Sequence, residues 1–108
     1  MNIFEWQTAG GKNEIEEYFR NTTQYEQAEY YKVKNSIETK GFQAFFQLNT
    51  RQLQGKLWEI KISKNRIMYV IADVENVYFI HVCKKQKDKA QKHELNKALK
   101  RARSENLL

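Results

Sequence analysis

The segment from Leu53 to Ala102 constrains the fold most, because three consecutive strand patterns lead there into one basic amphipathic helix. The strand patterns are the apolar and β-branched runs at residues 57–62, 66–72 and 77–83. The links between them are so short that neighbouring strands must pair antiparallel. The segment therefore predicts a meander of three strands, followed by a helix that lies across the sheet with its cations outward.

The first of these runs alternates cleanly between its two faces. Trp58, Ile60 and Ile62 point one way, and Leu57, Glu59 and Lys61 point the other way. We therefore expect the tryptophan face to be buried and the opposite face to be wet. The next two runs are apolar on both faces, which favours central strands.

The first half of the chain predicts helices. Residues 3–6 could form a first strand, after which two helices are expected at about residues 14–20 and 24–40, with Gly41 at the end of the second. Three pairs resemble capping boxes at helix starts, namely Asn13 with Glu16, Thr23 with Glu26, and Asp88 with Gln91. The aromatic cluster at residues 42–48 is interpreted as core.

These patterns together predict the fold class. We expect one α+β domain over residues 1–108, with an N-terminal helical hairpin, an antiparallel curved sheet of about four strands and a C-terminal basic helix. A chain of this length suits a single core.

Composition limits the setting of the protein. No apolar run is long enough to span a membrane, and the first residues lack the layout of a secretory signal. Cys83 is the only cysteine, so an internal disulfide is excluded, and we expect neither a metal site built on cysteines nor a cofactor. A reduced, cytoplasmic location without membrane contact fits these features best.

Charge is divided unevenly along the chain. Residues 1–45 carry 5 basic and 7 acidic side chains, whereas residues 46–103 carry 14 basic and 5 acidic ones, a net +9. Isolated cations, Lys61 and Arg66, interrupt the apolar strands, and more cations crowd the corner before the last helix. A block of this kind attracts polyanions, of which nucleic acid is the commonest in a cell. A surface that merely aids solubility is the alternative.

The same segment resembles a known family. Residues 57–61 (LWEIK), 65–69 (NRIMY) and 80–89 (IHVCKKQKDK) are similar in order and spacing to motifs of the RelE/ParE superfamily of bacterial toxins, most closely its HigB-like, phage-derived branch. The spacing of thirteen residues from His81 to Glu94 also matches that pattern. Lys61 stands where the family usually has arginine, Gln86 where it has lysine, and Ala90-Gln91 where it has Thr-Pro.

The resemblance implies a type II toxin that cuts messenger RNA on the ribosome without a metal, and that a co-expressed antitoxin, of the helix-turn-helix type, silences. Operator DNA would be bound only through the antitoxin complex. Two other functions stay open for the same fold, namely a gyrase inhibitor like the ParE branch and a regulator that binds nucleic acid without cutting it.

Four residues are candidates for the chemistry that the resemblance implies. Arg66 would bind two phosphate oxygens through its guanidinium, unless it only pairs with Glu59 on the adjacent strand. Lys61 and Lys85 would hold phosphate or transfer protons, unless they are ordinary solvated lysines. His81 could be an acid or base, although a lone histidine in an apolar strand is more often a packed core residue.

Further cations are expected to contact ribosomal RNA rather than to take part in the chemistry. They are Lys84, Lys87, Lys89, Lys92, Lys100 and Arg101.

Overall fold

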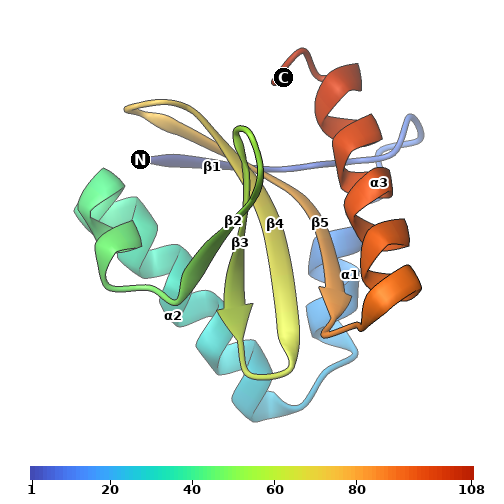
Figure 1. Cartoon of the computed structure of the whole chain (residues 1–108). Coiled ribbons are helices and arrows are strands. Elements are labelled where there is room, and N and C mark those ends of the chain that lie inside the picture. Colours follow the sequence, from blue (N-terminus) through green and yellow to red (C-terminus); the bar gives the residue numbers. More distant parts are fainter.

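The computed structural model describes residues 1–108, apart from the side chains of Asp88 and Ala90. The elements follow one another around a central sheet (Figure 1). In chain order they are β1 (Asn2–Glu5), α1 (Glu14–Arg20), α2 (Gln24–Lys40), the 3-10 helix η1 (Gly41–Phe46), β2 (Thr50–Gln54), β3 (Leu57–Ile62), β4 (Asn65–Asp73), β5 (Asn76–Lys84) and α3 (Asp88–Ser104).

In the described part of the chain, five strands form one mixed sheet in the order β1-β5-β4-β3-β2. The meander β3-β4-β5 is antiparallel as predicted, and β2 adds to β3 in the same sense. The edge strand β1 instead runs parallel to β5, with Ile3 opposite Val77. A parallel pairing is possible because the long path through α1, α2 and three strands separates the two.

The prediction of a four-stranded antiparallel sheet behind an N-terminal helical hairpin was therefore wrong in two ways. The chain begins with a strand, so the helices α1 and α2 are not N-terminal, and the sheet is mixed and has five strands within the described residues. The strand that the sequence pattern missed is β2, which reads TRQLQ and contains a single apolar residue, Leu53. The α+β class and the C-terminal helix are confirmed.

Helices cover both faces of the sheet. The helices α1 and α2 lie against one face, whose buried side chains include Ile60, Tyr69 and Phe79. The helix α3 lies across the other face and buries a second cluster with Leu57, Met68 and its own Leu99 (Figure 1). The central strands are apolar on both sides because each of their faces meets a helical layer.

The expected wet face of β3 is buried. Leu57 and Glu59 are inaccessible to solvent, because they lie on the α3 side of the sheet. Trp58 remains 37% exposed on the opposite face, near the sheet edge. Side chains of β3 alternate between the two faces as predicted, but the sequence of one strand gives no sign that a second helical layer covers its polar face.

Two of the three predicted helix starts have the expected N-cap. The Asn13 side chain accepts a hydrogen bond from the backbone N–H of Glu16 at 3.0 Å, and Thr23 accepts from that of Glu26 at 3.1 Å. The helix α3 begins one residue earlier than predicted, with Lys87 at the N-cap, and the predicted Asp88 cap lies outside the described side chains.

The aromatic cluster at residues 42–48 is only partly core. It forms η1, which starts at Gly41 with φ of +65°, a value that glycine adopts without strain. Ala44 is fully buried, but Phe46 is 80% exposed. None of the helices in the described residues is both long and apolar enough to cross a membrane.

Glu5 ties the edge strand β1 to both helices of the first layer. Its carboxylate accepts hydrogen bonds from Tyr30 at 2.7 Å and from Asn13, and it pairs with Lys34. Burial by itself would raise the pKa of Glu5, but the hydrogen bonds from Lys34, Tyr30 and Asn13 outweigh it, so that the pKa lies below its ordinary value of 4.5.

We expect Glu5→Gln to lower the free energy of unfolding at pH 7 by about 1–3 kcal/mol, because charged hydrogen bonds are lost in a partly buried position. A carboxylate with a lowered pKa stabilises the folded state above the unfolded pKa, and this contribution disappears as the pH falls through the folded pKa. The free energy of unfolding of the variant, measured with urea, should therefore fall less on acidification than that of the wild type. Glu75→Gln, at an exposed site, serves as the control, and equal acid sensitivity of Glu5→Gln and wild type would contradict the assignment.

Candidate functional site

Three of the four candidate catalytic residues lie on strands that turn the same face toward α3. Lys61 on β3 is directly opposite Arg66 on β4, and Arg66 is opposite Cys83 on β5. Paired residues point to the same face of a sheet, so these side chains share the α3 face. His81, opposite Met68, lies at a register shift in β5 and joins this face. Bulges of this kind re-aim side chains, as this one does for His81.

Arg66 is held in place by its own strand end. Its side chain is largely buried, and Nη1 donates to the backbone oxygens of Ser63 at 3.0 Å and Asn65 at 2.9 Å. Ser63 has φ of +57° in the tight turn between β3 and β4, and the bond from Arg66 supports that conformation.

Glu59 is a buried acid between two arginines. Arg66 Nε lies 3.8 Å from Glu59 Oε2, and Arg51 Nη2 donates to Glu59 Oε1 at 3.1 Å. The ion pair that the sequence offered as the alternative role of Arg66 is therefore present. It fixes the guanidinium without excluding a second, phosphate-binding role, because a guanidinium carries five N–H donors.

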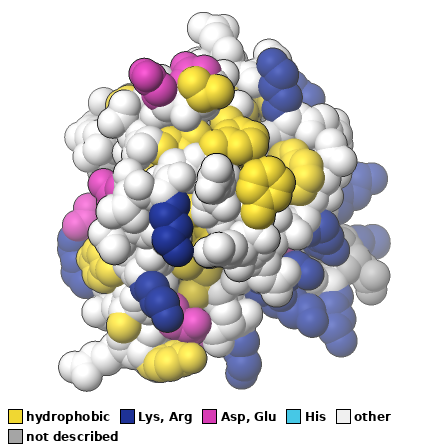
Figure 2. Space-filling view, turned by 90° about the vertical axis from the view of Figure 1, so that its left-hand side faces the viewer, with side chains coloured by type: hydrophobic (Ala, Val, Ile, Leu, Met, Phe, Trp, Pro, Cys, Tyr) yellow, Lys and Arg dark blue, Asp and Glu magenta, His cyan; other side chains and the backbone are white. Residues whose placement is uncertain are grey.

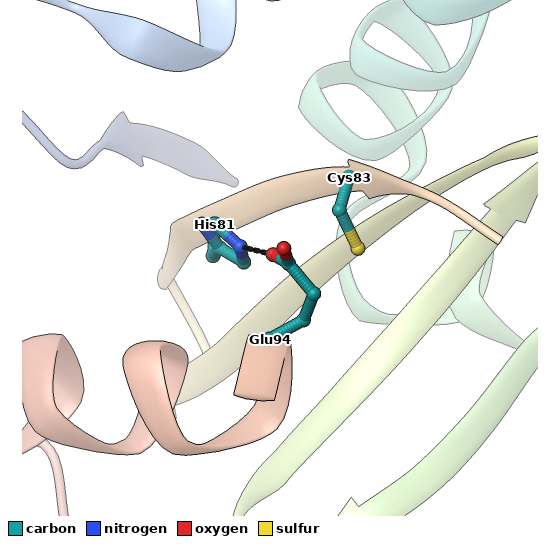
Figure 3. A group of neighbouring side chains, drawn as sticks. All are labelled: His81, Cys83 and Glu94. Atoms are coloured by element: carbon teal, nitrogen blue, oxygen red, sulfur yellow. Dashed lines mark hydrogen bonds and ion pairs between the residues drawn. The ribbon is translucent and has the colours of Figure 1, made fainter. Parts of the chain in front are cut away.

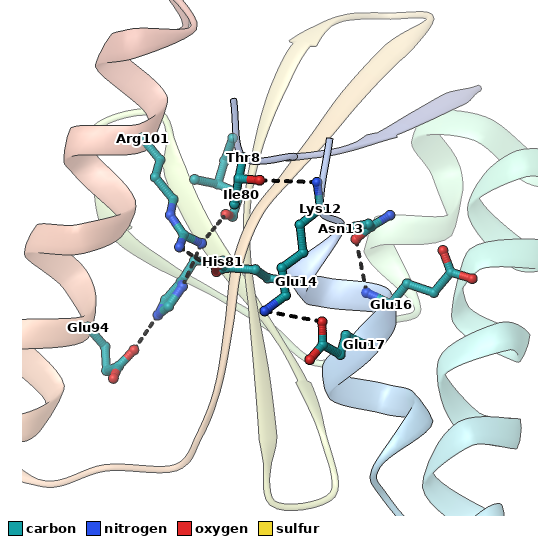
Figure 4. Close-up of polar contacts among 10 residues, drawn as sticks. All are labelled: Thr8, Lys12, Asn13, Glu14, Glu16, Glu17, Ile80, His81, Glu94 and Arg101. Atoms are coloured by element: carbon teal, nitrogen blue, oxygen red, sulfur yellow. Dashed lines mark hydrogen bonds and ion pairs between the residues drawn. The ribbon is translucent and has the colours of Figure 1, made fainter. Parts of the chain in front are cut away.

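His81 is buried, and both of its ring nitrogens are engaged (Figure 4). Nε2 contacts the Glu94 carboxylate, while Arg101 Nη1 lies 3.2 Å from Nδ1. An arginine can only donate, so Nδ1 must accept and the ring proton must sit on Nε2, where it is donated to Glu94. The contacts thus select one neutral tautomer of the imidazole.

The pKa of His81 lies below its ordinary value of 6.5. Burial is the main cause, since it disfavours the charged ring. Glu94 acts in the opposite direction, whereas the positive charges of Arg101 and Lys97 lower the pKa further. The packed, hydrogen-bonded state that the sequence offered as an alternative for this histidine is the one that the structure has.

Arg101 lies in the interior rather than among the surface cations with which it was grouped. Its Nη2 donates to Glu14 Oε2 at 2.7 Å, and Nη1 is also 3.3 Å from the backbone oxygen of Ile80 (Figure 4). The guanidinium stacks 4.0 Å from the centre of the Trp6 ring. Arg101 therefore joins α3 to α1 and β5, and it is 8% exposed.

The other expected RNA contacts, and the candidate Lys85, are exposed. They are Lys84, Lys87, Lys89, Lys92 and Lys100, on the end of β5, the corner and α3. Figure 2 shows Lys and Arg side chains gathered along one edge of the molecule, while hydrophobic side chains lie nearer the middle of that view. Lys85 N–H donates to the Lys64 backbone oxygen at 2.7 Å, which places it beside the turn that holds Arg66.

A cavity of about 400 Å³ lies between β5, α1 and α3, beside the contacts of His81 with Glu94 and Arg101. Its lining includes Tyr18, His81, Cys83, Lys84, Glu94 and Lys97. The sequence did not single out Tyr18, Cys83 or Lys97 as site residues. The one signal for Glu94 was its fixed spacing from His81, and the alternation of residues 81 and 83 on one strand face was the signal for Cys83.

Cys83 is the third side chain beside the His81–Glu94 contact, and Figure 3 shows its sulfur on the same side of β5 as the carboxylate. Burial, followed by the charges of Glu94 and Glu59, raises the pKa of its thiol to about 12. The thiol is therefore protonated in the free protein at neutral pH.

The fold and this site define a small α+β protein in which two cationic side chains pair across neighbouring strands, close to a lysine-rich segment where the last helix begins. The chain belongs to the family described as Phage derived protein Gp49-like (DUF891), whose model matches residues 17–103. This family is part of the RelE/HigB-like toxin family and is associated with toxins of toxin–antitoxin systems. The comparison with curated proteins gives no match.

The two charged neighbours of His81 should shift its pKa in opposite directions. Arg101→Gln removes a positive charge and is expected to raise the pKa of His81, whereas Glu94→Gln removes a negative one and is expected to lower it. An NMR titration of the imidazole signals measures both, with the exposed His93 as a reference signal in the same spectra. Shifts of the same sign in two folded variants would contradict the arrangement.

Proposed function

We propose that this protein is the toxin of a type II toxin–antitoxin pair and cuts messenger RNA on the ribosome. The observation that supports this most is the cross-strand pair Lys61–Arg66, beside the exposed Lys84 and Lys85 at the same end of the sheet. Membership of the Gp49-like family supports a toxin of this kind.

The cleavage we propose uses the 2′-hydroxyl of the substrate as nucleophile against the neighbouring phosphate. The protein then has to neutralise the charge that builds on that phosphate and to orient the reacting groups. Arg66 suits the first task because its guanidinium keeps its charge and is fixed by backbone oxygens and Glu59. Lys61 and Lys85 would hold the phosphate from either side.

His81 has a different part in this proposal than the sequence suggested. Both of its nitrogens are occupied by protein groups, so it would act as a positioning residue that orients Glu94. The Glu94 side chain is 23% exposed and lines the cavity, where a substrate hydroxyl can reach it. Its carboxylate could accept a proton there.

The last helix would supply affinity for the ribosome. Residues 84–103 carry 9 basic and 2 acidic side chains, and few aromatic ones on which single-stranded bases could stack. We therefore assign Lys84, Lys87, Lys89, Lys92 and Lys100 to phosphates of folded RNA. The proposed partners also include a cognate antitoxin of the helix-turn-helix type, through which alone the toxin would reach operator DNA.

Expression of the wild-type chain is expected to arrest growth and to produce cut messenger RNA. Arg66→Ala should relieve the arrest and slow cleavage in a translation extract by about 100- to 1000-fold, as for loss of one group that stabilises a transition state. Arg66→Lys, which keeps the charge but not the fork, should restore activity only in part.

Arg51→Gln is the matched control for these variants, because Arg51 also pairs with Glu59 but lies on β2 with its side chain 54% exposed. It should keep full activity. Full toxicity of a folded Arg66→Ala protein would refute the role of Arg66. Growth arrest with intact messenger RNA and inhibited gyrase would support the ParE-like function instead. If the protein neither arrests growth nor cuts RNA, the result would support a regulator that binds nucleic acid without cutting it.

Neutralising Lys87, Lys89 and Lys92 together to Gln is expected to weaken ribosome binding and to flatten its dependence on salt. Each lost phosphate contact should reduce the slope of log K against log salt by about 0.7–0.9, because fewer counterions are released. The control replaces three exposed lysines elsewhere, Lys32, Lys40 and Lys56, with the same change of net charge. Equal slopes for the two triple variants in a sedimentation assay would show that only net charge matters.

A further inference from the structure

The contact between His81 and Glu94 has a third member that the proposed nuclease chemistry does not use. One ligand atom from each of His81, Cys83 and Glu94 lies within 4.8 Å of the other two (Figure 3). An imidazole nitrogen, a thiol sulfur and a carboxylate oxygen are the three kinds of atom that bind zinc in proteins.

The three residues come together while each stays within a regular strand or helix. His81 and Cys83 are two residues apart on β5, so both turn toward α3, and Glu94 reaches back from the second turn of that helix. Backbone ladders fix the two strand residues, while the longer glutamate side chain can adjust.

The three ligand atoms lie close to the distances that a small tetrahedral ion requires. Zinc binds nitrogen and oxygen at about 2.0–2.2 Å and sulfur at about 2.3 Å, so that its ligand atoms stand roughly 3.3–3.8 Å apart. The His81–Glu94 contact has to open a little and the sulfur has to approach, both by rotation of side chains. All three residues also line the cavity of about 400 Å³, which gives an ion a route from solvent.

We propose that His81, Cys83 and Glu94 bind one divalent ion of the zinc class, with the fourth position open toward this cavity. The sequence predicted no metal site because it has a single cysteine, but here a histidine and a glutamate from other positions complete the ligand set. The site goes beyond the proposed function, since cleavage by the RNA's own 2′-hydroxyl does not call for it. An ion there would fasten the start of α3 to β5 and would take Glu94 away from a substrate.

Binding changes the protons of two ligands. The Cys83 thiol releases its proton to solvent as sulfur joins the ion. The proton of His81 moves from Nε2 to Nδ1, because the lone pair of Nε2 is now used by the metal. Arg101 must then leave Nδ1, and it keeps its partners Glu14 and the Ile80 backbone oxygen.

The test titrates the purified full chain with Co²⁺, a spectroscopic substitute for Zn²⁺. A cobalt–thiolate bond gives a charge-transfer band in the near ultraviolet, and Cys83 is the only cysteine that can produce it. We expect the band to saturate at one Co²⁺ per chain, to be accompanied by the visible bands of a tetrahedral ion, and to be bleached by one equivalent of Zn²⁺.

Variants locate the other ligands. Cys83→Ser should abolish the charge-transfer band, and His81→Gln and Glu94→Gln should each abolish saturation at one equivalent. His93→Gln is the matched control, because His93 precedes Glu94 on α3 but is exposed, and it should bind as the wild type does. Circular dichroism shows which variants are folded, and Glu94→Gln, the nearest in shape, keeps the test decisive if Cys83→Ser unfolds.

No charge-transfer band in the wild type would overturn the proposal, as would a band that persists in folded Glu94→Gln and His81→Gln proteins. Because no RNA enters the assay, failure here leaves the proposed nuclease standing, and failure of the nuclease leaves the metal site standing.

Discussion

The position of α3 depends on one buried guanidinium. Arg101 pairs with Glu14 of α1, donates to the backbone of β5, approaches His81 and stacks on Trp6. A buried charge is costly unless it is paired and hydrogen-bonded, and here each side of the guanidinium has a partner. Because these partners come from three other segments, the arginine fixes how α3 crosses the sheet. That crossing decides which polar residues of the strands are covered and which remain open.

The covered polar residues form a second compensated group. Glu59 is fully buried and lies between Arg51 and Arg66, so its charge is balanced from two strands. Removing Arg66, the buried partner, would leave the Glu59 charge poorly solvated, whereas water can take the place of the exposed Arg51 side chain. A rigid Arg66 follows from this arrangement. Structural pairing and phosphate binding are thus compatible roles of the same side chain, since one edge of the guanidinium can be held while another faces a ligand.

Much of the fold could be predicted from local patterns. The meander β3-β4-β5 follows from apolar runs and short links, and the N-caps Asn13 and Thr23 follow from side-chain chemistry within four residues. The polar strand β2 and the parallel pairing of β1 with β5 could not be predicted, because both depend on partners distant in sequence. The same reason limited the site. The pairing of Lys61 with Arg66 across β3 and β4 follows from the register of a short hairpin. The burial of Arg101, in contrast, depends on Glu14, which is 87 residues away.

Access is what separates the buried cations from the surface lysines. Arg66 is 9% exposed, and its Nη1 is turned toward two backbone oxygens, so a phosphate can meet only a small part of it. A freely diffusing RNA strand would seldom present a phosphate at that angle. An RNA strand that a larger assembly already bends and holds would present its phosphate at that angle repeatedly. The exposed lysines of α3 could supply the sequence-independent phosphate contacts for binding such an assembly. If the proposed nuclease function holds, the contrast between a rigid, largely buried arginine and an exposed lysine surface favours action on RNA held by a larger assembly over action on free RNA.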